Sequence, residues 1–237
     1  MHSSGSDRMR LQVGARTSPL SKIQVKEIFE ELCFFYPHIE FDVHYMTTVG
    51  DCDQKTSLRT LDRTDFFTKE IDAWVLSGVN RVGIHSAKDL PVPLKEGLLL
   101  FCLTHGLDPS DVLVMRPNET LQSLKAGALI ATSSKRRENA ARMLRADFSF
   151  CDLRGTIEQR LANLASHEAD GVIVAEAALI RLGMTHLNRV FLPGATAEGQ
   201  GKLAVVGRKQ DVEVHAIFAK LNEKKSEVER VQLKVRG

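Results

Sequence analysis

Residues 11–48 read LQVGARTSPLSKIQVKEIFEELCFFYPHIEFDVHYMTT, and this stretch decides the fold class. Residues 11–15 form a short apolar run, and residues 41–48 alternate apolar with polar side chains, as strands do. Between them, Ser18 followed by Pro19 is typical of a helix N-cap with proline at the first helical position. The succession of strand, helix and strand predicts an α/β fold with a mostly parallel sheet.

The same alternation continues along the rest of the chain. Further strands are expected at residues 81–85, 98–103, 112–115, 129–132, 148–153, 172–175 and 203–206. Further helices are expected at residues 66–76, 120–125 and 134–146, from the capping box TIEQ at 156–159, after residue 175 up to 182, and from residue 212 onward. Residues 49–65 are polar and are expected to form a long loop.

The order of these elements predicts two lobes of similar size, hinged by two crossovers near residues 104–108 and 193–200. The boundaries expected are residues 9–104 with 202–237 for lobe 1, and residues 105–201 for lobe 2. Residues 1–8 resemble a tag or a flexible leader, and we leave them out of the fold.

The composition argues against several classes of protein. The formal net charge is only +2, so no global excess of positive charge indicates nucleic-acid binding. The four cysteines and eight histidines are scattered without the spacing of a disulfide framework or a metal site. No apolar run has the length of a membrane span. We therefore expect a cytoplasmic monomer with reduced thiols and no metal, which binds neither nucleic acid nor membrane.

Charged and hydroxyl side chains gather where the predicted strands end. Ligands of open α/β sheets bind at the carboxyl ends of the strands, so these residues are candidate binding groups. They are Arg16 after the first strand, Ser86, Lys88 and Asp89 after residues 82–85, Arg136 and Arg137 after residues 129–132, and Arg154 after residues 148–153. Arginine makes planar, bidentate hydrogen bonds to carboxylates, so the set predicts a small ligand with several acidic arms.

The run TSSKRR at residues 132–137 places three cations in the first turn of a predicted helix. The helix dipole is positive at that end, so cations are unfavourable there unless an anion is bound. Backbone N–H groups, both serine hydroxyls and the guanidinium groups would hold such an anion. A solvated basic turn is the alternative.

The run RGT at residues 154–156 repeats this arrangement, because its threonine caps a helix whose opening turns carry Arg160. Arg154 as an ordinary ion-pair partner explains the same run equally well. Helix capping alone accounts for Ser18, and Arg181 near a helix C-terminus fits a structural role with the helix dipole.

The segment HSAKDLP at residues 85–91 places Lys88 beside Asp89 on a loop that Pro91 stiffens. A carboxylate in a cleft can accept hydrogen bonds from pyrrole or amine N–H groups, stabilise a cationic intermediate and pass protons. A turn aspartate that bonds its own backbone is the structural alternative.

Taken in order, these segments resemble the porphobilinogen deaminases, also called hydroxymethylbilane synthases. The resemblance extends from about residue 9 to residue 222 and rests on an ordered set of motifs. They are RTSPL at 16–20, FTKE at 67–70, IHSAKDLP at 84–91, DPxD at 108–111, TSSxRR at 132–137, LRGT at 153–156, RL at 160–161, AxxxRLG at 178–183 and EGQGxL at 198–203.

The resemblance implies lobes like those of periplasmic binding proteins and a transferase of porphyrin and haem biosynthesis. Such an enzyme condenses four porphobilinogen units into a linear tetrapyrrole and releases ammonia at each step. The resemblance implies that Asp89 is the catalytic carboxylate. It also implies a substrate- and cofactor-binding set of Arg16, Ser18, Ser86, Lys88, Thr132, Ser133, Ser134, Arg136, Arg137, Arg154, Gly155, Arg160, Arg181 and Gln200.

Two features depart from the family pattern. The family anchors a dipyrromethane cofactor to a cysteine of a third domain, and no cysteine here lies in the Gly-Gly-Cys context of that anchor. We therefore expect the third domain to be absent and dipyrromethane to be held non-covalently or not at all. The stretch TLDRTD at 60–65 lacks the glycine of the family's mobile loop. The alternative function is a non-catalytic two-lobed protein that binds pyrroles or another polycarboxylate.

Overall fold

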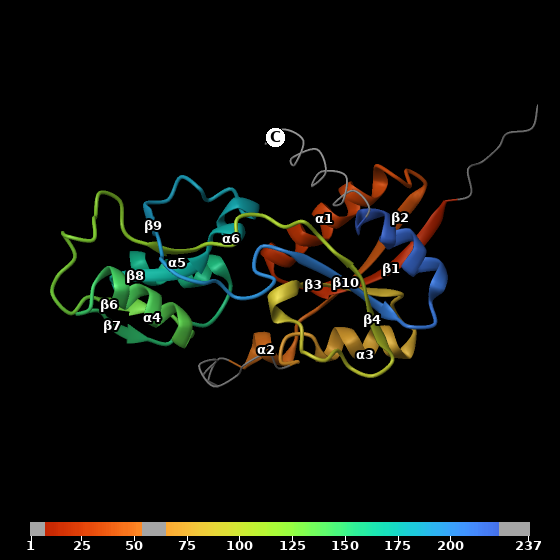
Figure 1. Ribbon diagram of the computed structural model, residues 1–237, viewed down its shortest axis with the longest axis horizontal. Coiled ribbons are helices and arrows are strands. Elements are labelled where there is room, and N and C mark those ends of the chain that lie inside the picture. Colours follow the sequence, from red (N-terminus) through yellow and green to blue (C-terminus); the bar gives the residue numbers. More distant parts are fainter. Residues whose placement is uncertain (1–7, 54–64, 223–237) are drawn as a thin grey trace, which may run out of the picture.

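The computed structural model describes residues 8–53 and 65–222. These residues form two lobes, each built on a five-stranded sheet, and two connections join the lobes (Figure 1). The first sheet has the strand order β2-β1-β3-β10-β4, and the second has the order β7-β6-β8-β5-β9. The predicted two-lobed α/β fold is confirmed.

Lobe 1 contains the strands β1 (Met9–Arg16), β2 (Ile39–Met46), β3 (Val82–Ser86), β4 (Leu98–Leu103) and β10 (Leu203–Arg208). Its helices are α1 (Pro19–Cys33), α2 (Val49–Cys52), α3 (Lys69–Ser77), the 3-10 turn η2 (Ala87–Asp89) and a helix that begins at residue 212. Lobe 2 contains the strands β5 (Asp111–Val114), β6 (Leu129–Ala131), β7 (Ser149–Cys151), β8 (Gly171–Ala175) and β9 (Arg189–Phe191). Its helices are α4 (Lys135–Leu144), α5 (Ile157–Ala165) and α6 (Glu176–Arg181).

Each sheet contains one reversed strand. In lobe 1, β1 is parallel to β2 and β3, whereas β10 is antiparallel to both of its neighbours, β3 and β4. In lobe 2, β6 is parallel to β7 and β8, whereas β5 is antiparallel to β8 and β9. Both reversed strands are the first strands after a connection between the lobes. The sheets are therefore mixed, and the remaining strands of each sheet share one direction.

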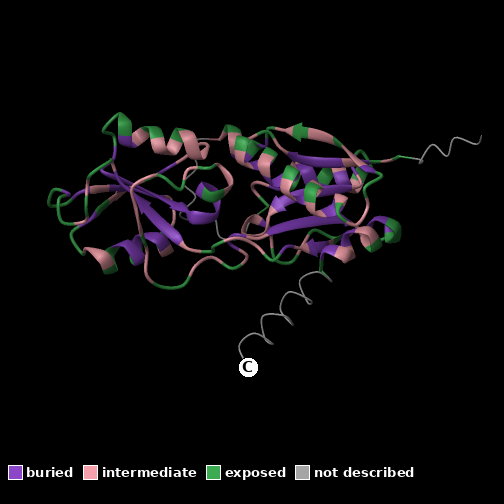
Figure 2. Cartoon of the chain, turned by 90° about the horizontal axis from the view of Figure 1, so that it is seen from above, coloured by how far each residue is buried: buried purple, intermediate pink, exposed green. Residues whose placement is uncertain are grey.

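Helix α1 shows how the sequence fixes the local structure. The Ser18 side chain accepts a hydrogen bond from the backbone N–H of Ser21 at 3.2 Å, so it satisfies one of the free donors at the helix start. The helix buries Val25, Ile28 and Leu32 against the sheet of lobe 1. Figure 2 shows the central strands of both lobes as the buried interior, with the exposed residues mostly on the helices, the loops and edge strands such as β2.

Three expectations about elements were wrong. Residues 120–125 form turns instead of a helix: the backbone N–H groups of Ser123 and Leu124 both bond to the Thr120 carbonyl, and the chain then turns at Gly127, which has a φ of 67°. Residues 49–52 form helix α2 instead of loop, because Thr48 and Asp51 build a capping box. Strand β9 was not predicted, and it pairs with β5 over only three residues.

Some expectations fall on residues outside the described ranges. They concern the leader at residues 1–7, most of the loop at 60–65 and the end of lobe 1 at 223–237. Among the residues that the structure describes, no helix combines the length and the apolar character needed to cross a membrane.

Candidate functional site

A cavity of about 450 Å³ lies between the two lobes. Lobe 1 supplies the ends of β1 and β3 with the η2 turn, and lobe 2 supplies the β7–α5 connection and α6. The predicted site residues that line the cavity are Arg16, Ser18, Ser86, Lys88, Asp89, Arg137, Arg154, Gly155, Arg160 and Arg181. The ends of strands from both sheets therefore meet at one place, as the sequence pattern predicts.

Other predicted site residues lie beside the cavity without lining it. The Ser133 hydroxyl donates to the carbonyl of Leu153 at 2.8 Å and accepts from its N–H at 2.7 Å, so it ties the ends of β6 and β7 together. Ser134 caps α4 by accepting from the backbone N–H of Arg137. Thr132 is buried beside them. Arg136 and Gln200 belong to a cluster centred on Asp111.

This cluster surrounds the carboxylate of Asp111, which is 2% exposed. Arg136 and Arg137 approach its two oxygens at 2.6 and 2.7 Å, and the Gln200 amide donates to it at 2.9 Å. Burial alone would raise the pKa of Asp111, but Arg137 and Arg136 outweigh it and the pKa is lowered. Asp111 thus compensates part of the positive charge of Arg136 and Arg137 at the start of α4, while Lys135 pairs with Glu138.

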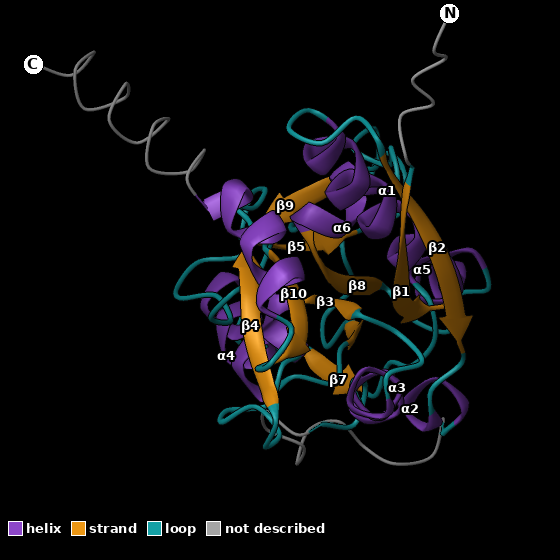
Figure 3. Cartoon of the chain, turned by 90° about the vertical axis from the view of Figure 1, so that its right-hand side faces the viewer, coloured by secondary structure: helices purple, strands orange, loops and turns teal. Residues whose placement is uncertain are grey.

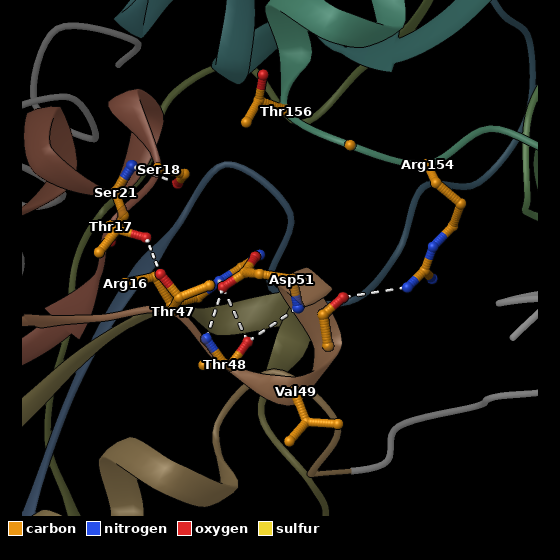
Figure 4. A network of polar contacts seen from close by, with 12 residues as sticks. Arg16, Thr17, Ser18, Ser21, Thr47, Thr48, Val49, Asp51, Arg154 and Thr156 are labelled. Carbon is orange, nitrogen blue, oxygen red and sulfur yellow. Dashed lines mark hydrogen bonds and ion pairs between the residues drawn. The ribbon is translucent and has the colours of Figure 1, made fainter. Parts of the chain in front are cut away.

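Arg16 has an internal carboxylate partner too. Its guanidinium donates through Nε to Asp51 at 3.2 Å and through Nη2 to the other oxygen of the same carboxylate (Figure 4). Burial would raise the pKa of Asp51, but the hydrogen bond from Arg16 leads the effects that lower it. The guanidinium also lies over the Phe67 ring, 4.6 Å from its centre. Arg16 is therefore held rigidly at the cavity edge.

Arg154 extends from lobe 2 toward lobe 1, as Figure 4 shows. Its Nη2 donates to the backbone carbonyls of Gly50, at 3.1 Å, and of Asp53. Its Nη1 is buried and has no hydrogen-bond partner among the described residues. A buried guanidinium with an unused donor is costly unless an acceptor arrives, so this nitrogen is suited to an anionic ligand.

Lys88 and Arg160 carry the least compensated charges in the cavity. Burial, followed by repulsion from Arg137, lowers the pKa of Lys88 to about 8 and that of Arg160 to about 10, and Asp89 offsets part of both effects. Lys88 donates to the Gln200 amide oxygen at 3.2 Å, and Arg160 donates to the Gly155 carbonyl at 2.8 Å. Asp89, at the end of η2, is thus the carboxylate that faces these two cations.

Arg181 lines the cavity but is paired inside the protein. It donates through Nε and Nη2 to both carboxylate oxygens of Glu27, at 2.7 and 2.9 Å. Glu27 lies on α1 of lobe 1, so this ion pair spans the two lobes.

Sequence reasoning missed several residues that line the cavity, among them Asp51, Phe67 and Gln24. The TxxD pattern at residues 48–51 would have found Asp51, since it matches a capping box. Gln24 lies four residues from both Leu20 and Ile28, which puts a polar side chain on the buried face of α1. Within the described ranges, no group of three or more potential metal ligands is present.

Comparison with known proteins agrees with this geometry. Residues 11–216 match the family model of the porphobilinogen deaminase, dipyromethane cofactor binding domain. The chain is 36% identical to a porphobilinogen deaminase of Nostoc sp., over 90% of this chain and 68% of that protein. It is 37% identical to a probable porphobilinogen deaminase of Chlamydia muridarum, over 84% of this chain and 81% of that protein.

Solved structures support the fold alone. CbnR, a LysR family transcriptional regulator, superposes with a TM-score of 0.57 at 12% identity, over 92% of this chain and 70% of the regulator. A probable amino-acid ABC transporter extracellular-binding protein from Bacillus subtilis superposes with a TM-score of 0.55 at 14% identity, over 95% and 97% of the two chains. The two-lobed architecture is thus that of the periplasmic binding proteins. The sequence match, in contrast, points to a single family. The chain belongs to the porphobilinogen deaminase family.

Proposed function

We propose that the cavity between the lobes performs the family's reaction, with Asp89 as the catalytic carboxylate. Membership of the family makes the chain a hydroxymethylbilane synthase, a transferase that condenses porphobilinogen into a linear tetrapyrrole. The observation that carries the assignment of Asp89 is its position: it lines the cavity beside Lys88 and interacts with Arg160 from the opposite lobe.

The acidic arms of porphobilinogen would bind Arg154, Lys88 and Arg160. Arg154 offers an unused buried N–H, and Lys88 and Arg160 lie in a region where burial disfavours their charge. A carboxylate arm relieves that cost, because an opposite charge stabilises a buried cation far more than it would in water. Arg16 would orient the ligand at the cavity edge without losing Asp51.

Asp89 would accept a hydrogen bond from the pyrrole N–H of the bound substrate. When the protonated aminomethyl nitrogen leaves as ammonia, the methylene carbon and the ring share one positive charge, and the carboxylate of Asp89 stabilises it. The α-carbon of a second pyrrole then forms the new carbon–carbon bond and loses its proton, which a carboxylate at this place can accept. Each condensation thus consumes one porphobilinogen and releases one ammonia.

Dipyrromethane is the cofactor of the family's matching domain. The residues present fit such a group, because a molecule with several carboxylate arms supplies an acceptor for Nη1 of Arg154 and negative charge beside Arg160 and Lys88. We propose that these residues hold it without a covalent bond to any of the described cysteines, none of which forms a disulfide among the described residues. When bound, the cofactor supplies the pyrrole end that the first substrate unit extends. Intact-mass measurements on native and denatured protein decide the mode: a mass lost on denaturation supports non-covalent binding, and a retained one contradicts it.

Substitution of Asp89 tests the proposed function. The variant Asp89→Asn keeps the side-chain shape but loses the negative charge, so we expect ammonia release from porphobilinogen to fall at least about 100-fold. Asp65→Asn, on an exposed residue outside the cavity, serves as the control and should release ammonia like the parent. Equal rates in Asp89→Asn and the parent would remove Asp89 from the mechanism. Binding of porphobilinogen by the parent without ammonia release would indicate a binding protein instead.

A further inference from the structure

Arg181 lines the cavity, but its guanidinium is bound to three internal acceptors: two carboxylate oxygens and one carbonyl. Both oxygens of Glu27 accept from it, and its Nη2 also donates to the carbonyl of Gly201 at 2.9 Å. Its side chain is only 4% exposed. The partners come from α1 of lobe 1 and from the connection that returns the chain to lobe 1.

The positive charge of Arg181 is therefore already compensated by the carboxylate of Glu27. A ligand carboxylate would have to displace Glu27 from a two-point ion pair to bind this guanidinium, and the displaced carboxylate would remain partly buried with no partner. Arg154 and Arg160 demand no such exchange, because among the described residues they donate to carbonyl oxygens. Ligand arms should consequently prefer those two arginines over Arg181.

The ion pair also has a mechanical consequence. It joins α6 of lobe 2 to α1 of lobe 1, and Arg154 joins lobe 2 to α2 on another side of the cavity. Figures 1 and 3 both place the α1–α6 contact and α2 at opposite edges of the region between the lobes. The two contacts differ in chemistry. Arg154 donates to carbonyl oxygens, with which a ligand carboxylate can compete. Arg181 forms a two-point ion pair with Glu27, which a ligand would have to break.

We propose that Glu27 is a positioning residue: it withdraws Arg181 from the ligand-binding set and uses it to fix the lobes at one edge of the cavity. The cavity can then open and close only at the α2 edge, where Arg154 and Asp89 meet the substrate. The kinetic part of this inference rests on the proposed function, whereas the structural part does not.

The variant Glu27→Gln tests the inference, because it keeps the shape and removes the charge. We expect small-angle X-ray scattering of the ligand-free protein to show a larger radius of gyration. We also expect the KM for porphobilinogen to rise roughly tenfold while kcat stays within about twofold, since the tie affects binding geometry and not the reacting atoms. Glu30→Gln is the matched control, because Glu30 lies on the same helix, is exposed and pairs with Lys26 of that helix at 3.5 Å. It should leave both quantities unchanged.

A charge exchange shows whether Arg181 acts through its ion pair with Glu27 or through direct contact with the ligand. In the double variant Glu27→Arg with Arg181→Glu, the ion pair forms again with its charges reversed, so the scattering profile and KM should return toward those of the parent. If KM stays as poor as in Arg181→Glu alone while the scattering profile recovers, Arg181 binds the ligand itself and the inference is wrong. A parent-like scattering profile and KM for Glu27→Gln would likewise overturn it. If the parent releases no ammonia, the proposed function is wrong. The scattering result still decides whether the Glu27–Arg181 ion pair holds the lobes together.

Discussion

Arg16 and Arg137 each form an ion pair with a carboxylate inside the protein, whereas Lys88 and Arg160 are influenced at longer range by Asp89, and Lys88 also by Asp111. On our proposal, this difference separates cations that build the cleft from cations that bind the ligand. The sequence identified the cations correctly as a group at strand ends. It could not assign their partners, because Asp111 lies 26 residues from Arg137 and the pairing depends on the fold.

Lys88 offers a test at this scale. Its pKa of about 8 is below the ordinary lysine value of 10.5, so the charged form destabilises the folded state below pH 8, and this destabilisation disappears as pH rises from about 8 to 10.5. At pH 7, the free energy of unfolding of Lys88→Met, measured by urea denaturation, should therefore exceed that of the parent by about 1–2 kcal/mol. At pH 10 the two proteins should differ little. The same variant should bind porphobilinogen more weakly at pH 7.

Lys26→Met, at an exposed position, provides the control, and both its free energy of unfolding and its KM should equal those of the parent. In the parent, the affinity for the anionic substrate should decrease as pH rises through about 8, because Lys88 loses its charge. A Lys88→Met variant that is less stable than the parent at both pH values would show that burial of the charged lysine does not destabilise the protein.

At the scale of elements, the caps were predictable and the short strands were not. Ser18, Ser134 and Thr156 each cap a helix as expected, because a cap is decided by residues three positions apart. Strand β9 owes its existence to pairing with β5, which lies more than seventy residues earlier in the chain. Its three residues carry too little periodicity of their own to predict a strand.

The turn before α5 offers a test at this scale. Gly155 has a φ of 93°, and a Cβ there would lie 2.6 Å from Oε1 of Gln159, the atom that accepts from the Thr156 N–H in the capping box. Gly155→Ala should therefore lower the free energy of unfolding by about 2–4 kcal/mol. It should also raise the KM, because Arg154 and Arg160 flank this turn.

Gly183→Ala is the matched control, since Gly183 has a φ of 68° and open space around its Cβ position. It should cost about 1 kcal/mol from backbone strain alone and leave the KM unchanged. Equal losses of stability in both variants, with no kinetic difference, would show that the capping box does not position the arginines. Urea denaturation and steady-state kinetics give both quantities.

For the whole molecule, the alternation of strands and helices predicted two lobes with two crossovers, and the structure has both. The reversal of β5 and β10 was not visible in the sequence, since the direction of a strand follows from where the chain enters a lobe. The pair between Arg181 and Glu27 joins residues 154 positions apart, so only the closed arrangement of the lobes reveals it. What the sequence supplied best was the family.

A crystal structure with porphobilinogen bound to the Asp89→Asn variant, which should not consume it, tests the central claim most directly. We expect the pyrrole nitrogen within hydrogen-bonding distance of the side chain at position 89, and the acidic arms on Arg154, Arg160 and Lys88. Arg181 should remain paired with Glu27. Porphobilinogen bound outside the cavity between the lobes, or bound there with its pyrrole nitrogen far from position 89, would contradict the account.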